Sequence, residues 1–120
     1  MNTYYIVTQA GIEENGHFLY PNAIFSDDNG NTQLCINGEE ARQLLAEDVA
    51  EMCSNGTSFA INDGEYVTFD PVDYEGEEDV LRNKIIEYVL QNMKPESGQY
   101  AEISFSGGSK RNYTINSITI

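Results

Sequence analysis

The chain has 120 residues and a formal net charge of −14 at pH 7, with 20 acidic residues against six Lys and Arg and one His. Hydrophobic residues make up 40% and aromatic residues 11%, too many for a disordered acidic tail, so we expect a single folded domain over residues 1–120. A field of this sign repels nucleic acid and acidic membranes, which excludes both as direct partners, and it attracts basic surfaces.

The negative charge is unevenly distributed along the chain. Seventeen of the acidic residues lie within residues 1–81, where Arg42 is the only base, so this part has a formal charge of −16. Residues 82–120 have five bases and three acids, a formal charge of +2. General acidity that serves solubility is one explanation, but it would be spread along the chain. The asymmetry favours charge that is directed at a basic partner.

The first 36 residues predict a β-meander. Residues 3–9 are rich in aromatic and β-branched types and predict a strand, and residues 17–25 predict one or two short strands interrupted at Pro21. Asn-Gly turns are expected at residues 13–16 and 27–30, and residues 32–36 predict the third strand.

An amphipathic helix is predicted over residues 39–54. Asn37 offers an N-cap side chain, and apolar residues recur at helical spacing from Ala41 to Met52. The acids of this segment fall mainly on the other faces, and Asn55-Gly56 ends the pattern.

The remaining segments predict two hairpins and a second helix. Residues 58–62 and 65–70 flank Asp63-Gly64, a strong hairpin signal, and residues 70–79 form an acidic connection. A helix is expected over residues 77–93, stopped by Pro95. Residues 99–106 and 112–120 then alternate around a Ser-Gly-Gly-Ser turn and predict the last hairpin. The resulting order, βββ-α-ββ-α-ββ, indicates an α+β fold with a mostly antiparallel sheet and two amphipathic helices.

No pattern of catalytic residues is recognisable, so we expect a protein that is not an enzyme and that needs no cofactor or metal. His17 is the only histidine, Cys35 and Cys53 lie in no nucleophile motif, and there is no phosphate loop or zinc spacing. Two alternatives stay open: a Cys–His pair, and a calcium loop at Asp27-Asp28-Asn29-Gly30-Asn31, although its glycine is misplaced.

The first residues have no basic region and no long apolar core, so we expect no signal peptide, and no apolar stretch in the sequence is long enough to span a membrane. We therefore expect it in the cytoplasm of a host cell, with both cysteines reduced and buried.

The acidic residues predict a binding surface for a basic protein. Carboxylates held on a helix face, a hairpin turn and a connecting loop can fill a cleft that Lys and Arg line for DNA, and a tyrosine among them can serve as an anchor. The candidate partner-binding residues are Glu47, Asp48, Glu51, Asp63, Glu65, Asp70, Asp73, Tyr74, Glu75, Glu77, Glu78 and Asp79. For each group of them, a simple solvated face is the alternative.

In composition, the chain resembles the small acidic proteins with which phages and mobile elements inhibit host defence nucleases, namely anti-CRISPR and DNA-mimicking antirestriction proteins. Local similarities to the antirestriction type lie in Tyr5-Ile6-Val7 with Asn15-Gly16, and in residues 59–63 with Asp73-Tyr74-Glu75-Gly76. The resemblance implies that the chain occludes a nucleic-acid channel, such as the part of an RNA-guided nuclease that reads the flanking motif.

A second hypothesis is a structural or adaptor protein that associates with itself through a sheet edge, with residues 99–120 as the interface. A homodimer is compatible with either hypothesis.

Overall fold

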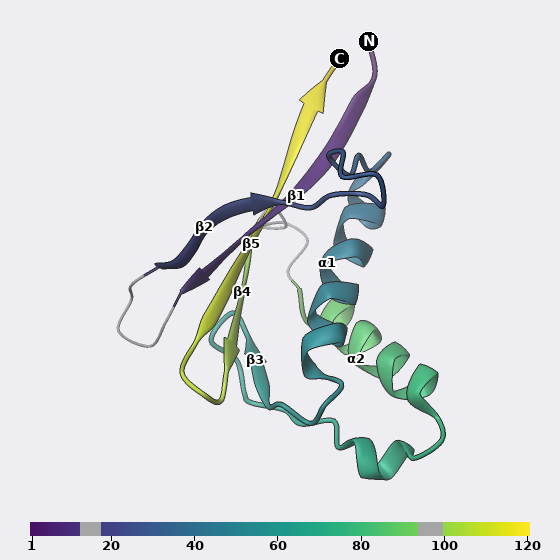
Figure 1. Cartoon of the computed structure of the whole chain (residues 1–120), viewed down its shortest axis with the longest axis vertical. Helices are drawn as coiled ribbons and strands as arrows, with labels where there is room; N and C mark the ends of the chain where they lie inside the picture. Colours follow the sequence, from purple (N-terminus) through teal and green to yellow (C-terminus); the bar gives the residue numbers. More distant parts are fainter. Residues whose placement is uncertain (13–17, 94–99) are drawn as a thin grey trace.

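The computed structural model of the chain describes residues 1–12, 18–93 and 100–120 (Figure 1). At residues 10, 12, 18–24 and 100 it describes the backbone alone. The turn predicted at residues 13–16, the single histidine His17 and the helix-stopping Pro95 lie outside the described residues.

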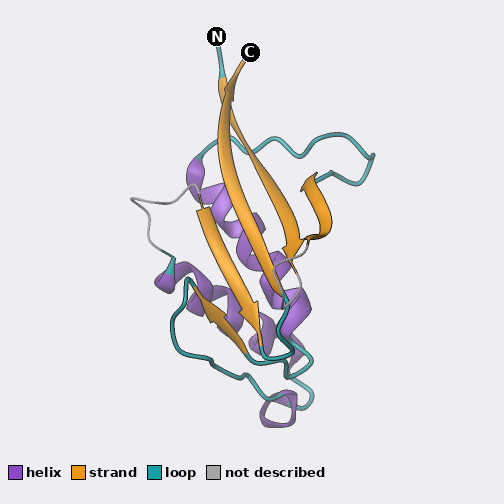
Figure 2. Ribbon diagram, turned by 90° about the vertical axis from the view of Figure 1, so that its left-hand side faces the viewer, coloured by secondary structure: helices purple, strands orange, loops and turns teal. Residues whose placement is uncertain are grey.

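Five strands form one antiparallel sheet with the spatial order β2-β1-β5-β4-β3. They are β1 (Thr3–Ile12), β2 (Phe18–Ile24), β3 (Phe59–Ile61), β4 (Tyr100–Phe105) and β5 (Lys110–Thr119). Helices α1 (Gly38–Cys53) and α2 (Glu78–Asn92) lie against one face of this sheet, and the short 3-10 helix η1 (Pro71–Tyr74) precedes α2 (Figures 1 and 2). The predicted α+β class, with an antiparallel sheet and two helices, is confirmed.

One predicted strand, residues 32–36, is reduced to isolated bridges. Cys35 and Tyr5 exchange two backbone hydrogen bonds of 2.8 Å, but the pairing extends no further along β1. The reason is local: Gln33 N donates to Phe25 O at 2.8 Å, which keeps this segment folded back on itself, and Asn37 starts the helix two residues after the bridge.

The second half of the predicted hairpin at residues 58–70 is also reduced to a bridge, between Phe59 and Val67. A tight turn forms one residue earlier than the predicted Asp63-Gly64: Asn62 and Asp63 take positive φ (49° and 62°), and Gly64 N donates to Ile61 O at 2.9 Å. Pro71 then begins η1, so the chain leaves the sheet after a short pairing. Over the described residues the order is therefore ββ-α-β-α-ββ, with two strands fewer than predicted.

Helix α1 confirms the prediction for residues 39–54 in its bounds and its N-cap. Asn37 Oδ1 accepts a hydrogen bond from Glu40 N at 2.8 Å, as a capping asparagine does. Its buried face packs on the sheet and on α2, and consists of Ala41, Leu45, Ala46, Val49, Ala50 and Cys53. The acids of α1 lie outside this buried face, and Glu39, Glu40 and Glu51 are exposed.

Strands β1 and β5 are paired over ten residues, from Thr3 with Thr119 to Ile12 with Lys110. This pairing places the β4–β5 hairpin in the middle of the sheet, between β1 and β3. The interpretation of residues 99–120 as an edge interface is therefore wrong for most of the hairpin. Gln99 lies outside the described residues.

Across the described residues, no helix has both the length and the apolar character needed to cross a membrane.

Candidate acidic interface

The acidic connection between β3 and α2 is tightly folded. Asp70 Oδ1 accepts from Val72 N at 2.9 Å and caps η1, whose first residue is Pro71. Glu77 N then donates to Tyr74 O at 2.7 Å, and Gly76 takes a positive φ of 80° to allow that turn. The backbone of this connection therefore has a defined conformation, from which its acidic side chains extend into solvent.

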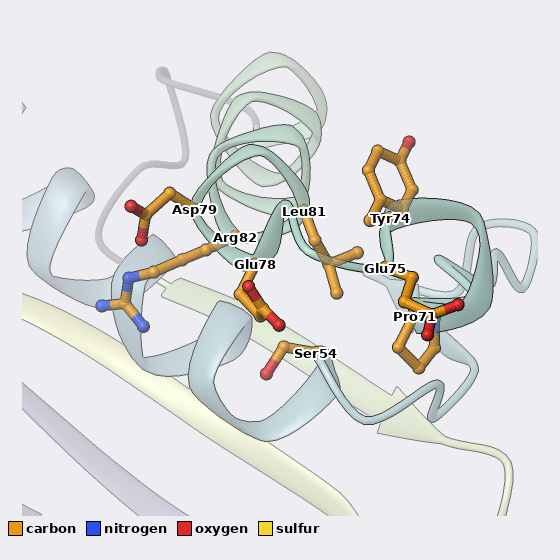
Figure 3. A pocket seen from close by; sticks show the side chains of 8 residues that line it. All are labelled: Ser54, Pro71, Tyr74, Glu75, Glu78, Asp79, Leu81 and Arg82. Carbon is orange, nitrogen blue, oxygen red and sulfur yellow. The ribbon is translucent and has the colours of Figure 1, made fainter.

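A cavity of about 330 Å³ lies where this connection meets the two helices (Figure 3). Its walls come from the end of α1, from η1 and from the first turn of α2. The lining residues are Ser54, Pro71, Tyr74, Glu75, Glu78, Asp79, Leu81 and Arg82. Three carboxylates and one guanidinium thus surround a site whose inner wall is apolar.

Gly56 sets the spacing between the two walls of this cavity. It follows α1 with a φ of +95°, and a Cβ atom placed on it would lie 3.2 Å from Pro71 Cδ. A side chain here would strain the backbone and push η1 away from the end of α1. The sequence marks Gly56 only as a helix terminator, so its contact with η1 was not predictable from it.

The lining residues of the cavity suit a basic side chain. Glu75, Glu78 and Asp79 are exposed, so their oxygens can accept charge-assisted hydrogen bonds from an incoming Lys or Arg. Tyr74 is half-buried and offers a ring against which a guanidinium can lie. Glu78 and Asp79 lie in the first turn of α2, where acidic side chains complement the positive end of the helix dipole.

The structure brings four of the predicted residues together in the cavity: Tyr74, Glu75, Glu78 and Asp79. Asp73 and Glu77 are exposed on the same connection. Asp70 Oδ1 accepts the hydrogen bond from Val72 N that caps η1. Asp63 and Glu65 are exposed at the turn after β3, and Glu51 is exposed on α1. Sequence reasoning did not single out Arg82 or Ser54, because neither has a pattern that would mark it.

Two of the predicted residues on α1 lie elsewhere. Asp48 Oδ2 accepts hydrogen bonds from Tyr113 Oη at 2.5 Å and from Arg111 Nη1 at 3.3 Å, so it links α1 to β5. Its side chain is only 22% exposed. Glu47 Oε1 accepts from Gln43 Nε2 at 3.2 Å and lines a separate hollow of about 320 Å³ beside Cys35. Asp48 therefore has a structural role, in which it joins α1 to β5. It does not line the cavity.

The proposed calcium loop is a hydrogen-bonded turn. Asp27 Oδ1 accepts from Asn29 N at 2.9 Å and from Asn31 N at 3.0 Å. Among the described residues there is no group of three or more His, Cys, Asp or Glu placed to hold a metal ion.

The two thiols are expected to be unreactive in the native protein. Cys35 and Cys53 are 1% and 0% exposed, and burial raises the pKa of both, that of Cys53 to about 12. Titration with a thiol-specific chromogenic reagent near pH 8 should therefore detect almost no thiol in the native state and both after denaturation. Rapid reaction of either cysteine without denaturant would contradict this environment.

Raising the pH above about 10 should destabilise the protein. Burial, and then the Asp48 carboxylate, raise the pKa of Tyr113 far above its usual 10.0, and burial raises that of Cys53 from 9.0 to about 12. The unfolded chain releases these protons at their usual pKa values while the native state retains them, so stability is lost as pH rises. Urea unfolding between pH 8 and pH 11 should show this loss, and Tyr113→Phe should have the shallower slope above pH 10. Equal slopes would refute the role of Tyr113.

Comparison with protein-family models, with curated proteins and with solved structures finds no match for the chain.

Proposed function

We propose that the chain is a non-enzymatic inhibitor from a phage or mobile element that presents its acidic cavity to the basic, nucleic-acid-binding cleft of a host defence nuclease. The observation that carries the proposal is the cavity between η1 and α2, whose lining includes the exposed acids Glu75, Glu78 and Asp79 and the half-buried Tyr74. A Lys or Arg side chain that normally contacts a DNA phosphate finds equivalent acceptor oxygens there.

Two further features support this function. The formal charge of −16 on residues 1–81 extends the negative field well beyond the cavity, which would speed association with a positive cleft. The carboxylates of the cavity come from the residue after η1 and from the first turn of α2, so little backbone ordering is needed when a partner binds. Inhibition then follows from competition with DNA for one cleft, inside the host cytoplasm, without any direct contact between the chain and nucleic acid.

The test uses one RNA-guided DNA nuclease and one restriction nuclease, each with a fluorescently labelled duplex substrate. The chain should displace the duplex from at least one of them, as measured by anisotropy, and added salt should weaken this effect. A block of DNA cleavage that leaves DNA binding intact would contradict nucleic-acid mimicry, as would displacement that is insensitive to salt.

A matched pair of variants separates the cavity from net charge. The first carries Glu75→Gln, Glu78→Gln and Asp79→Asn, and the second carries Asp28→Asn, Glu39→Gln and Glu87→Gln at exposed positions outside the cavity. Both lose three negative charges. The cavity variant should inhibit at least about tenfold less well, because it loses charge-assisted contacts, whereas the control should change much less. Equal losses would reduce the mechanism to a general charge effect.

A further inference from the structure

The ends of β1 and β5 form a two-stranded ribbon that extends beyond the rest of the sheet. The last described pair between β4 and β5 is Tyr100 with Thr114, yet β5 continues in register with β1 as far as Thr119. Figure 2 shows these two strands rising past the helices and past β4. Here β5 is an edge strand over residues 116–119, as far as the described residues extend.

The hydrogen bonds of the ribbon fix which backbone groups face outward. Asn2 and Ile120 exchange two backbone hydrogen bonds of 2.8 and 2.9 Å, so the N–H and C=O groups of Ile120 point toward β1. Because this direction alternates along an antiparallel strand, the groups of Ile118 also point toward β1, and those of Ser117 and Thr119 point away from it. The outer edge of the ribbon is defined by the backbone groups of these two residues.

This edge has none of the usual protection against pairing. Residues 112–120 contain no charged side chain, no glycine and no proline, and residues 1–12 contain no charged side chain. Natural sheets protect their edges with charges, prolines or bulges. The outer strand β2 has such devices, namely Pro21 and two register shifts against β1. Over the residues that the structure describes, the ribbon is therefore an edge without charged side chains or proline, in a chain of net charge −14.

The charge distribution favours a second copy of the chain at this edge. Two molecules of charge −14 repel one another wherever their acids face each other, and the neutral ribbon is where they can approach. The ribbon and the acidic cavity beside η1 lie at opposite ends of the molecule, whose long axis is 48 Å (Figure 1). Pairing at the ribbon thus places the two acidic ends far apart.

We propose that two copies pair antiparallel through β5 about a two-fold axis at Ile118. Ser117 of each copy then exchanges backbone hydrogen bonds with Thr119 of the other, which satisfies the outer edge on both sides. Ile118 faces Ile118 of the second copy. The interface is isologous, so it closes at a dimer.

Side-chain alternation supports this register. Tyr113 and Ile115 are buried toward the helices, so Ile118 and Ile120 lie on the uncovered face of the sheet. Ile120 is 68% exposed, and Ile118 has Tyr4 as its cross-strand neighbour. In the dimer, the two Ile118 side chains would extend this apolar row across the axis, with Cβ atoms about 5 Å apart.

The first experiment measures the dissociation constant by sedimentation equilibrium. Ser117→Pro removes an outward N–H group and leaves the β1 pairing intact, whereas Ser117→Ala keeps that group and is the matched control. The wild type and Ser117→Ala should dimerise equally, and the constant of Ser117→Pro should rise at least about tenfold; at concentrations where all three are monomeric, their melting temperatures should be equal. A monomeric wild type, or equal weakening of both variants, would overturn the proposal.

The second experiment tests the two-fold axis by oxidative cross-linking. Ile118→Cys should form a covalent dimer quickly, because its thiol meets its own copy across the axis. Asn116→Cys, on the same face but opposite residue 120 of the second copy, should cross-link far more slowly. Because Cys35 and Cys53 are buried, the wild-type chain gives the background rate of cross-linking. Equal rates for the two variants, or open-ended polymers, would refute the closed dimer.

Salt separates this proposal from the proposed function, on which it does not rest. Screening should strengthen the dimer, since it weakens repulsion between two negative molecules, whereas it should weaken binding to a basic nuclease. The triple cavity variant should still dimerise, and Ser117→Pro should still bind through the cavity. The two proposals can therefore fail separately.

Discussion

Replacing Asp48 by alanine is expected to lower the free energy of unfolding by about 2–3 kcal/mol. The carboxylate accepts hydrogen bonds from the Tyr113 hydroxyl and the Arg111 guanidinium, and its side chain and that of Arg111 are 22% and 24% exposed. Alanine would leave a phenol that is 0% exposed without this acceptor, and it would remove the Asp48 carboxylate from beside the partly desolvated Arg111 guanidinium. The cost is the desolvation of the two groups that remain.

The neighbouring acid provides the control. Glu47→Ala removes the same charge from the same helix, but Glu47 accepts only from Gln43 one turn earlier, so its effect should stay within about 0.5 kcal/mol. Urea unfolding of both variants, with Tyr113→Phe and the double variant Asp48→Ala/Tyr113→Phe, completes a mutant cycle. A cycle without coupling, or equal effects of Asp48→Ala and Glu47→Ala, would show that Asp48 acts through charge alone.

Phe59→Ala should cost about 4 kcal/mol, the largest loss that we expect from a single substitution. The ring is fully buried at the centre of an aromatic group, 6.3 Å from that of Phe69 and 5.9 Å from that of Tyr88. Phe69 and Tyr88 are in turn 5.8 Å apart, in an edge-to-face arrangement. The three rings join β3, the segment before η1 and α2, so this cluster also supports the acidic cavity.

Tyr66→Ala is the matched control, because that ring is 56% exposed in the segment that follows β3 and its loss should be nearly neutral. Thermal and urea unfolding should therefore show a much lower stability for Phe59→Ala than for Tyr66→Ala. Phe59→Ala should also weaken binding at the cavity under conditions where the variant is still folded, since η1 loses its support. A small loss of stability in Phe59→Ala would contradict this prediction, because it would mean that the core repacks to fill the space left by the ring.

The helices could be predicted closely because their signals are local. Asn37 as a cap, the apolar spacing from Ala41 onward and the Asn55-Gly56 stop gave α1 to within a residue at each end. The α+β class followed from the same patterns. The failures are tertiary: whether residues 32–36 and 65–70 become strands depends on which edges are available to them, and a periodicity of two does not encode that.

The candidate site could be predicted in part, for a related reason. Charge density marked residues 70–79, and four of the predicted residues do line one cavity. The same signal also selected Asp48. The sequence does not distinguish a helical acid that faces solvent from one that faces an arginine on a strand 63 residues later. The register between β1 and β5 brings Arg111 beneath α1. This register joins residues that are far apart in the sequence, so no pattern near Asp48 predicts it.

The close approach of Gly56 to Pro71 has a consequence for how this protein can change under selection. The carboxylates around the cavity are exposed and separate from the core, so their number and identity can vary at little cost to folding. Position 56 is more restricted, because its φ of +95° strains other residues and a Cβ atom there would lie 3.2 Å from Pro71 Cδ. A library that randomises both should return many sequences at Glu75, Glu78 and Asp79 among folded clones, and mainly glycine at position 56. The molecule thus separates a conformationally restricted position in its frame from an exposed rim that tolerates substitution.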